Sequence, residues 1–202
     1  MRAAGFERPV NSLTYRRETT EAVQEITVSL HRHQDDLSNT VATMLTNYTV
    51  VMDAVNQAIE AMTGGDHELG GNFAITLNDW TLRLSNPRVE EPDFRMDIAQ
   101  PDSVPAAVSI LRDSLAAQTI PILDRFKTPA DLCKAKLEGD DCVFFLGPAD
   151  YLRVVAANML CGRHDEALKV MDRWVGKRTG TRKRYKPVYD YLAARREESQ
   201  SG

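Results

Sequence analysis

The chain has 202 residues, of which 43% are hydrophobic and 27% charged, and it carries a formal net charge of −4. No apolar run approaches the roughly 20 residues that a membrane helix needs, and the N-terminus lacks the apolar core of a signal peptide. Three cysteines without a C-x-x-C pair argue against a disulfide framework and for a reducing compartment. We therefore expect a cytoplasmic protein that does not bind membranes.

The first hundred residues are predicted to be mainly sheet. Ser12–Glu18 and Val23–His33 indicate a β-hairpin, because apolar and polar residues alternate along the second segment, as in a half-buried strand. Further short strands are expected within Asn72–Ser85, where Trp80 would cover the sheet, and within Phe94–Ala99.

The segment Thr40–Met62 is open to two interpretations. Its apolar residues recur at helical spacing, whereas its threonines and valines favour a strand, because β-branched side chains lose rotamer freedom in a helix. We expect a strand over Thr40–Val51 and then a helix over Asp53–Met62, which the glycines at positions 64 and 65 would stop. A single long helix is the alternative.

One long amphipathic helix is predicted over Val104–Phe126. Its apolar residues recur at spacings of three, four and eight, which places them on one face. These residues are Val104, Val108, Leu111, Leu115, Leu123 and Phe126. Asp102 or Ser103 would cap this helix with a side-chain oxygen. Pro121 lacks a backbone N–H and would kink the helix near Thr119.

The C-terminal half is predicted to be mainly helical. Helices are expected over Pro129–Leu137, Tyr151–Cys161, His164–Val175 and Pro187–Arg196. Together, the elements predict one α+β domain over residues 1–202, with an antiparallel β-meander covered by the long helix and a C-terminal helical hairpin or bundle beside it. Residues 1–100 would form mainly the sheet and residues 101–202 mainly the helices.

Four segments of the chain occur in an order that characterises a family. GFER lies near the start, followed by YRR and VQEITVSL, then by VSILRDSLAAQTIPILDRF, and finally by YLRVVAANMLCGRHDEAL. In this order they resemble a family of bacterial proteins, common in actinobacteria, that is described only as a domain of unknown function. The resemblance runs from Gly5 to Trp174 and implies an α+β fold without an established activity. Asp93–Phe94–Arg95 stands where the family has tandem tryptophans.

His31 and His33 lie two residues apart on a predicted strand, so their side chains would project from one face. With Asp35 and Asp36 they could form a zinc or iron site, because neutral imidazole and carboxylate are ordinary ligands of both metals. However, no third ligand has a recognisable spacing, and polar residues are common where a strand ends. A metal-dependent enzyme at His31 and His33 is therefore an alternative hypothesis only.

Residues 173–186 carry seven basic side chains and no acidic one. Those that could neutralise nucleic-acid phosphates are Lys177, Arg178, Arg182, Lys183, Arg184 and Lys186. Aromatic residues that could stack on bases lie nearby, namely Trp174, Tyr185, Tyr189 and Tyr191. The alternative interpretation is a flexible charged loop before the final helix.

No motif in the sequence identifies a catalytic class. The chain lacks G-x-S-x-G, G-x-x-x-x-G-K-[ST], G-x-G-x-x-G and H-E-x-x-H, which removes the best-marked hydrolases, nucleotide-binding proteins and metalloproteases. We therefore expect a non-enzymatic protein-interaction module without a cofactor, whose partner is another protein. A nucleic-acid-binding accessory protein that uses residues 177–186 is the main alternative.

Overall fold

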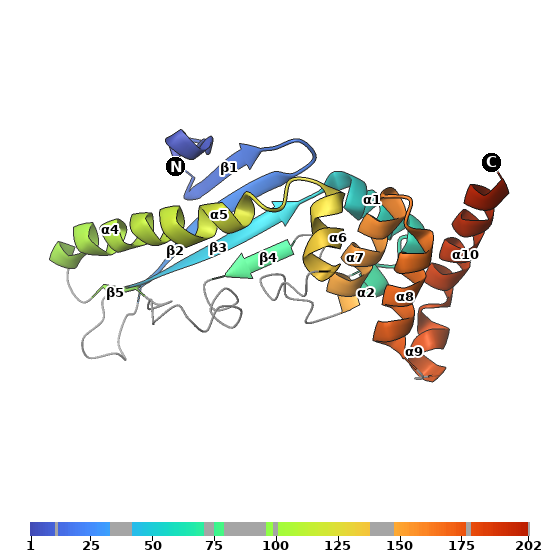
Figure 1. Cartoon of the computed structure of the whole chain (residues 1–202). Helices are drawn as coiled ribbons and strands as arrows, with labels where there is room; N and C mark the ends of the chain where they lie inside the picture. The colour runs from blue at the N-terminus through green and yellow to red at the C-terminus, as the bar shows by residue number, and fades with distance from the viewer. Residues whose placement is uncertain are drawn as a thin grey trace. The chain divides into compact units, whose positions relative to one another are not determined.

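The computed structural model of the chain describes residues 1–10, 12–32, 42–70, 75–78, 96–98, 101–137, 148–176 and 179–201. It has an α+β fold, which confirms the predicted fold class (Figure 1). The chain divides into two compact units, which we call the sheet unit and the helical unit. The sheet unit comprises Met1–Thr19, Val23–Val50 and Thr76–Arg125, and the helical unit comprises Thr20–Ala22, Val51–Ile75 and Phe126–Gly202.

This division differs from the predicted split at residue 100. The long helix belongs to the sheet unit, although it follows residue 100, and the helix that begins at Asp53 belongs to the helical unit. The single domain over residues 1–202 stays a prediction.

Within the described residues, five strands form one sheet. They are β1 (Thr14–Glu18), β2 (Val23–Arg32), β3 (Ala42–Val51), β4 (Ile75–Asn78) and β5 (Met96–Ile98). Their hydrogen-bonded order is β1-β2-β3-β4, and β5 also pairs with β3. β1 is antiparallel to β2 with Tyr15 opposite Ile26, and β5 is antiparallel to β3 with Ala42 opposite Ile98. The predicted hairpin and the two later strands are confirmed, whereas Trp80 lies outside the described residues.

The ambiguous segment is a strand followed by a helix, as expected. β3 ends at Val51 and α1 (Asp53–Thr63) begins two residues later, so the alternative of one long helix is wrong. Every second residue of β3 is buried, from Ala42 through Tyr48 to Val50. Alternate burial is the pattern of a strand with one face in the core, which agrees with the strand preference of the β-branched residues in this segment. Gly64 ends α1 with a φ of 64°, as predicted.

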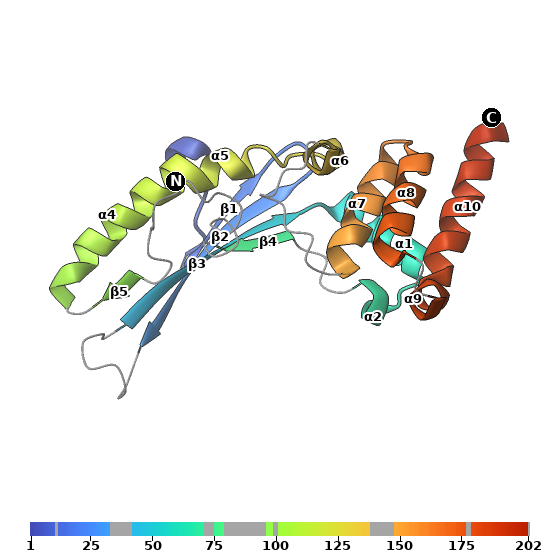
Figure 2. The same cartoon turned by 60° about the horizontal axis from the view of Figure 1, so that its bottom comes forward.

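The long helix is present in three parts. They are α4 (Val104–Ser114), a π-helical turn at Leu115–Thr119 and α5 (Ile120–Leu123), which together run along one face of the sheet (Figure 2). The backbone N–H of Ile120 donates to the carbonyl of Leu115, which is the wide i→i−5 pattern of a π turn. Where the sequence predicts a kink near Thr119, the structure has this π turn, which ends at Thr119.

Two details of the long-helix prediction are wrong. Of the predicted apolar stripe, Val104 is 40% exposed and Val108 is 52% exposed, and Ala107 is buried in their place. The other members of the stripe are buried as predicted, namely Leu111, Leu115, Leu123 and Phe126. Ser103 is the N-cap residue, but it ends a short 3-10 turn with helical backbone angles, and its side chain makes no capping hydrogen bond.

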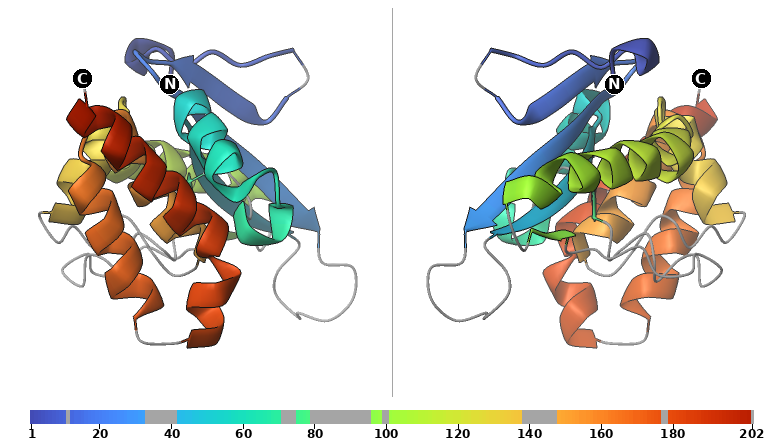
Figure 3. Two further views of the ribbon diagram at one scale, coloured as in Figure 1. Left: turned by 90° about the vertical axis from the view of Figure 1, so that its right-hand side faces the viewer. Right: turned by 90° about the vertical axis from the view of Figure 1, so that its left-hand side faces the viewer.

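The helical unit is built around α7 (Pro148–Leu160). Residues 152–158 of this helix are all buried, as expected for a helix with neighbours on every side. It contacts α1, α6 (Pro129–Leu137), α8 (His164–Val175) and the short α2 (His67–Gly70). α10 (Lys186–Ser201) packs against α8 and α1, and Figure 3 shows these helices from two sides.

The C-terminal helices agree with the sequence prediction. α6, α7, α8 and α10 lie at the expected places, and Gly162 turns between α7 and α8 with a φ of 69°. A short additional helix, α9 (Thr179–Arg184), occupies part of the basic segment, for which a flexible charged loop was the alternative interpretation. None of the described helices is long and apolar enough to cross a lipid bilayer.

Candidate protein-binding surface

The basic segment is largely engaged with acidic residues of its own unit. Arg182 lies 3.6 Å from the Asp172 carboxylate, and its guanidinium lies 4.7 Å from the centre of the Tyr189 ring. Arg184 donates to the backbone carbonyl of Glu68 at 3.2 Å and lies 3.9 Å from the Glu68 carboxylate.

The remaining basic residues of the segment differ in whether they have an acidic partner. Lys186 pairs with Asp190 one helical turn later on α10. Lys183 has no acidic partner among the described residues, and Lys177 and Arg178 lie outside them. Four of the candidate residues for phosphate contacts are described, and three of them, Arg182, Arg184 and Lys186, therefore have an acidic neighbour that offsets their charge.

The aromatic residues near the basic segment make contacts within the protein. Trp174 stacks on Tyr151 with ring centres 5.3 Å apart, and Tyr185 meets it edge-on at 4.6 Å. Tyr185 is only 3% exposed, and burial raises the pKa of its hydroxyl. The Tyr189 hydroxyl donates to the Asp172 carboxylate at 3.0 Å. These contacts occupy ring faces and edges that a nucleic-acid base would need.

The metal site predicted at His31 and His33 stays a prediction. His31 belongs to β2, and His33 lies outside the described residues, as do Asp35 and Asp36. Within the described ranges, no group of three or more His, Cys, Asp and Glu side chains is arranged to hold a metal ion.

A hollow that the sequence analysis missed lies beside the N-terminal segment of the sheet unit. Glu7 and Arg16 exchange two backbone hydrogen bonds of 2.8 Å, which hold this segment against the outer edge of β1. The hollow has a volume of about 420 Å³. It is lined by Arg2, Phe6, Arg8, Pro9, Val10 and Tyr15.

Positive charge at the hollow comes from two exposed arginines. Neither the Arg2 nor the Arg8 guanidinium has an acidic partner within the described part of the chain. Arg8 also borders a second hollow of about 450 Å³, where Arg16 pairs with Glu18 at 3.3 Å. The first hollow is therefore the more strongly positive of the two.

Exposed apolar side chains adjoin the same hollow. Val10, which lines the hollow, is 90% exposed, and Leu13, two residues before the lining residue Tyr15, is 53% exposed. Tyr15 lies opposite the buried Ile26 in the antiparallel pair of β1 and β2, and Leu13 is the residue that precedes β1. We call Arg2, Phe6, Arg8, Val10, Leu13 and Tyr15 the N-terminal surface.

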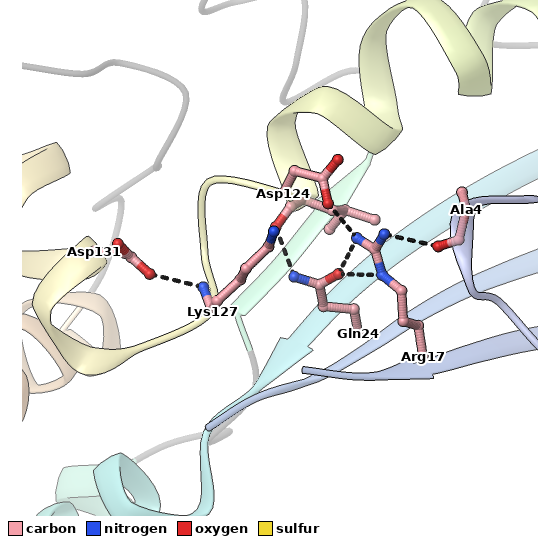
Figure 4. A network of polar contacts seen from close by, with 7 residues as sticks. Ala4, Arg17, Gln24, Asp124, Lys127 and Asp131 are labelled. Carbon is pink, nitrogen blue, oxygen red and sulfur yellow. Dashed lines mark hydrogen bonds and ion pairs between the residues drawn. The ribbon is translucent and has the colours of Figure 1, made fainter. Parts of the chain in front are cut away.

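A partly buried polar cluster fixes the base of the N-terminal surface (Figure 4). Arg17 donates to the carbonyl of Ala4 at 2.8 Å, to the side-chain oxygen of Gln24 at 3.0 Å and to the Asp124 carboxylate at 2.9 Å. Its guanidinium also lies 4.4 Å from the centre of the buried Phe6 ring. The N-terminal segment is thus tied to β1, β2 and the end of α5.

Gly5 is required at this cluster for two reasons. Its φ of 78° is strained for residues with a side chain, and a Cβ atom would lie 3.3 Å from Cδ of Arg17. The sequence did carry a signal for this surface, because residues 1–17 contain four arginines and one acidic residue.

Comparison of the chain with models of protein families, with curated proteins and with solved structures finds no match. The resemblance to the actinobacterial family therefore stays an expectation.

Proposed function

We propose that the protein is a protein-interaction module, and that its N-terminal surface binds an acidic segment of a partner protein. The observation that carries this proposal is that two arginines without acidic partners in the described residues flank a hollow beside exposed apolar side chains. The partner segment would carry carboxylates for Arg2 and Arg8 and an apolar side chain for Val10 and Leu13.

The chemistry of these side chains supports a protein partner. The planar guanidinium can donate two parallel hydrogen bonds to one carboxylate, which favours acidic ligands. Arginine and tyrosine are also enriched among the residues that carry most of the energy of protein interfaces. Because the Arg17 cluster holds the segment in place, little conformational entropy would be lost on binding.

The alternatives have less support. A nucleic-acid partner at residues 177–186 would have to compete with Asp172, Glu68 and Asp190 for three of the charges. A metal-dependent enzyme at His31 and His33 rests on sequence spacing alone. A cytoplasmic location is part of the proposal and rests on the composition.

Fluorescence anisotropy with labelled peptides tests the proposal. The first peptide combines glutamates with leucines, the second replaces the glutamates by glutamines, and the third replaces the leucines by serines. We expect the first peptide to bind most tightly and the Arg8→Glu variant to bind it at least about tenfold more weakly, because a like charge then opposes the carboxylates.

Lys183→Glu is the matched control, because it reverses one exposed charge in the helical unit and is expected to leave peptide binding unchanged. An equal loss in both variants would contradict a specific N-terminal surface. If instead an oligonucleotide binds with a steep salt dependence that Lys183→Glu weakens, the nucleic-acid alternative replaces the proposal.

A further inference from the structure

Both cations of the hollow beside the N-terminal segment are available to the same ligand. Arg2 and Arg8 line this hollow together with Tyr15, and no acidic residue of the described ranges lines it. Neither guanidinium forms an ion pair or a hydrogen bond with a described residue, and the Tyr15 hydroxyl has no hydrogen-bond partner among them. A single ligand group that enters the hollow would therefore meet two positive charges and one hydroxyl.

The second hollow, on the same segment, differs in its charges. It shares Arg8 with the first hollow, but Glu7 and Glu18 also line it. Arg16, a further lining residue, pairs with Glu18 at 3.3 Å. A doubly negative ligand would be repelled by these carboxylates and would have to compete with them for the arginine. The first hollow is therefore the better site on the N-terminal surface for a doubly charged anion.

The backbone holds the two arginines of the first hollow in place. Arg2 lies in the 3-10 turn η1 (Arg2–Ala4), and its carbonyl accepts a backbone hydrogen bond of 2.9 Å. Arg8 follows Glu7, which is hydrogen-bonded to β1, and precedes Pro9, whose ring restricts the backbone angle φ. Two like charges are thus kept at one hollow without a counter-charge, and an anion that binds there relieves their repulsion.

We infer that this hollow binds a phosphoryl group on a phosphorylated serine or threonine of the partner's acidic segment. The inference rests on the function proposed above and places one phosphoryl group where two carboxylates were considered. Such a group carries a charge of about −1.5 to −2 at neutral pH and has three strong acceptor oxygens. Each guanidinium can donate two parallel hydrogen bonds to it. One compact dianion matches both cations, whereas two separate carboxylates in the same hollow would repel each other.

The exposed apolar side chains favour a peptide as the carrier of the phosphoryl group. Val10 lines the hollow and is 90% exposed, and the nearby Leu13 is 53% exposed. A free phosphate ion would leave both side chains in water, whereas an apolar residue next to the phosphorylated position would cover part of them. The ligand is therefore a phosphorylated segment with leucine or a similar residue beside the phosphoserine or phosphothreonine.

Fluorescence anisotropy with the full chain and three labelled peptides tests the inference. The peptides share their leucines and carry at the centre either phosphoserine, a pair of glutamates that matches its charge, or serine. We expect the phosphoserine peptide to bind at least about tenfold more tightly than the glutamate peptide, because only one phosphoryl group can meet both arginines at once. The serine peptide should bind most weakly.

Three variants test whether the preference for phosphoserine arises at this hollow. Arg2→Gln and Arg8→Gln should each reduce the preference over the glutamate pair to about twofold or less, because one guanidinium is lost. Arg16→Gln is the matched control, since it removes an exposed cation that lines only the second hollow, and it should keep the full preference. Loss of the preference in Arg16→Gln, but not in the other two variants, would overturn the inference.

The outcomes also separate this inference from the proposed function. Equal binding of the phosphoserine and glutamate peptides, both weakened by Arg8→Glu, would overturn the phosphoryl group as ligand and leave the protein-interaction function in place. A lack of binding by every peptide would overturn both. Inorganic phosphate should displace the labelled peptide at least about tenfold less effectively than the unlabelled phosphoserine peptide does. Equal displacement would overturn a peptide as the carrier.

Discussion

The side-chain amide of Gln24 donates a hydrogen bond of 2.6 Å to the backbone carbonyl of Leu123, which follows 99 residues later. Gln24 is fully buried, and its oxygen accepts two hydrogen bonds from the Arg17 guanidinium. The Gln24 side chain on β2 therefore gives hydrogen-bond partners both to the Leu123 carbonyl at the end of α5 and to the largely buried Arg17 guanidinium on β1. The N-terminal surface depends on this arrangement, because Arg17 also holds Ala4 and Phe6.

Replacement of Gln24 by leucine should destabilise the protein strongly. It would leave the Leu123 carbonyl and part of the Arg17 guanidinium without partners in a buried site, at a cost of about 3 kcal/mol. Urea denaturation of the full chain measures this loss. Gln57→Leu, at an exposed position of α1, is the control and should change stability by no more than about 0.5 kcal/mol. Similar values for both variants would show that the cluster contributes little.

Replacement of Thr119 by valine should stabilise the protein. The Thr119 hydroxyl is buried in the π turn, and no described residue forms a hydrogen bond with it. Valine has nearly the same shape without the polar atom, so we expect a gain of about 1 kcal/mol in the free energy of unfolding. Thr63→Val is the matched control, because the equally buried Thr63 hydroxyl donates to the Ile59 carbonyl at 2.9 Å. A gain in the control but not at Thr119 would contradict this explanation.

Asp131 should stabilise the start of α6. Its carboxylate accepts hydrogen bonds from the backbone N–H groups of Lys127 at 2.9 Å and Thr128 at 2.8 Å, and from the Thr128 hydroxyl at 3.0 Å. Asp131→Ala should therefore cost about 1 kcal/mol, as the loss of a helix cap usually does. Asp131→Asn keeps an acceptor oxygen and should recover part of that loss in the same thermal denaturation experiment.

Tyr189 should make stability depend on alkaline pH. Burial, followed by the hydrogen bond to Asp172, raises the pKa of its hydroxyl to about 12. The unfolded chain releases this proton near pH 10, so the contribution of Tyr189 is complete below that value and is lost as pH rises toward 12. Wild-type stability should fall more steeply than that of Tyr189→Phe between pH 10 and 12, measured by urea denaturation. Equal slopes would contradict the raised pKa.

The local features of this protein could be predicted from its sequence. Alternation with a period of two identified the β1–β2 hairpin, and helical periodicity identified α6, α7, α8 and α10. Gly64 and Gly162 were recognisable as points where a helix ends, and each has a positive φ. These signals were sufficient because strand alternation, helix periodicity and glycine turns are set by neighbouring residues along the chain.

The face of α4 that is buried was decided by the tertiary structure. Val104 and Val108 fit the apolar stripe as well as Leu111 does, but Ala107 and Leu111 are buried while Val104 and Val108 are exposed. Periodicity predicts that a helix has an apolar face, yet the position of the sheet selects which side of a broad face is covered.

Partners that are distant in sequence were also decided only by the tertiary structure. Asp172 and Glu68 pair with arginines of the basic segment, and Gln24 joins Arg17 to Leu123. In each case the residue types were visible in the sequence, but their proximity was not. Side chains pair only when they lie within a few ångströms of each other. Residues that are distant in the sequence come within that distance only when the chain folds.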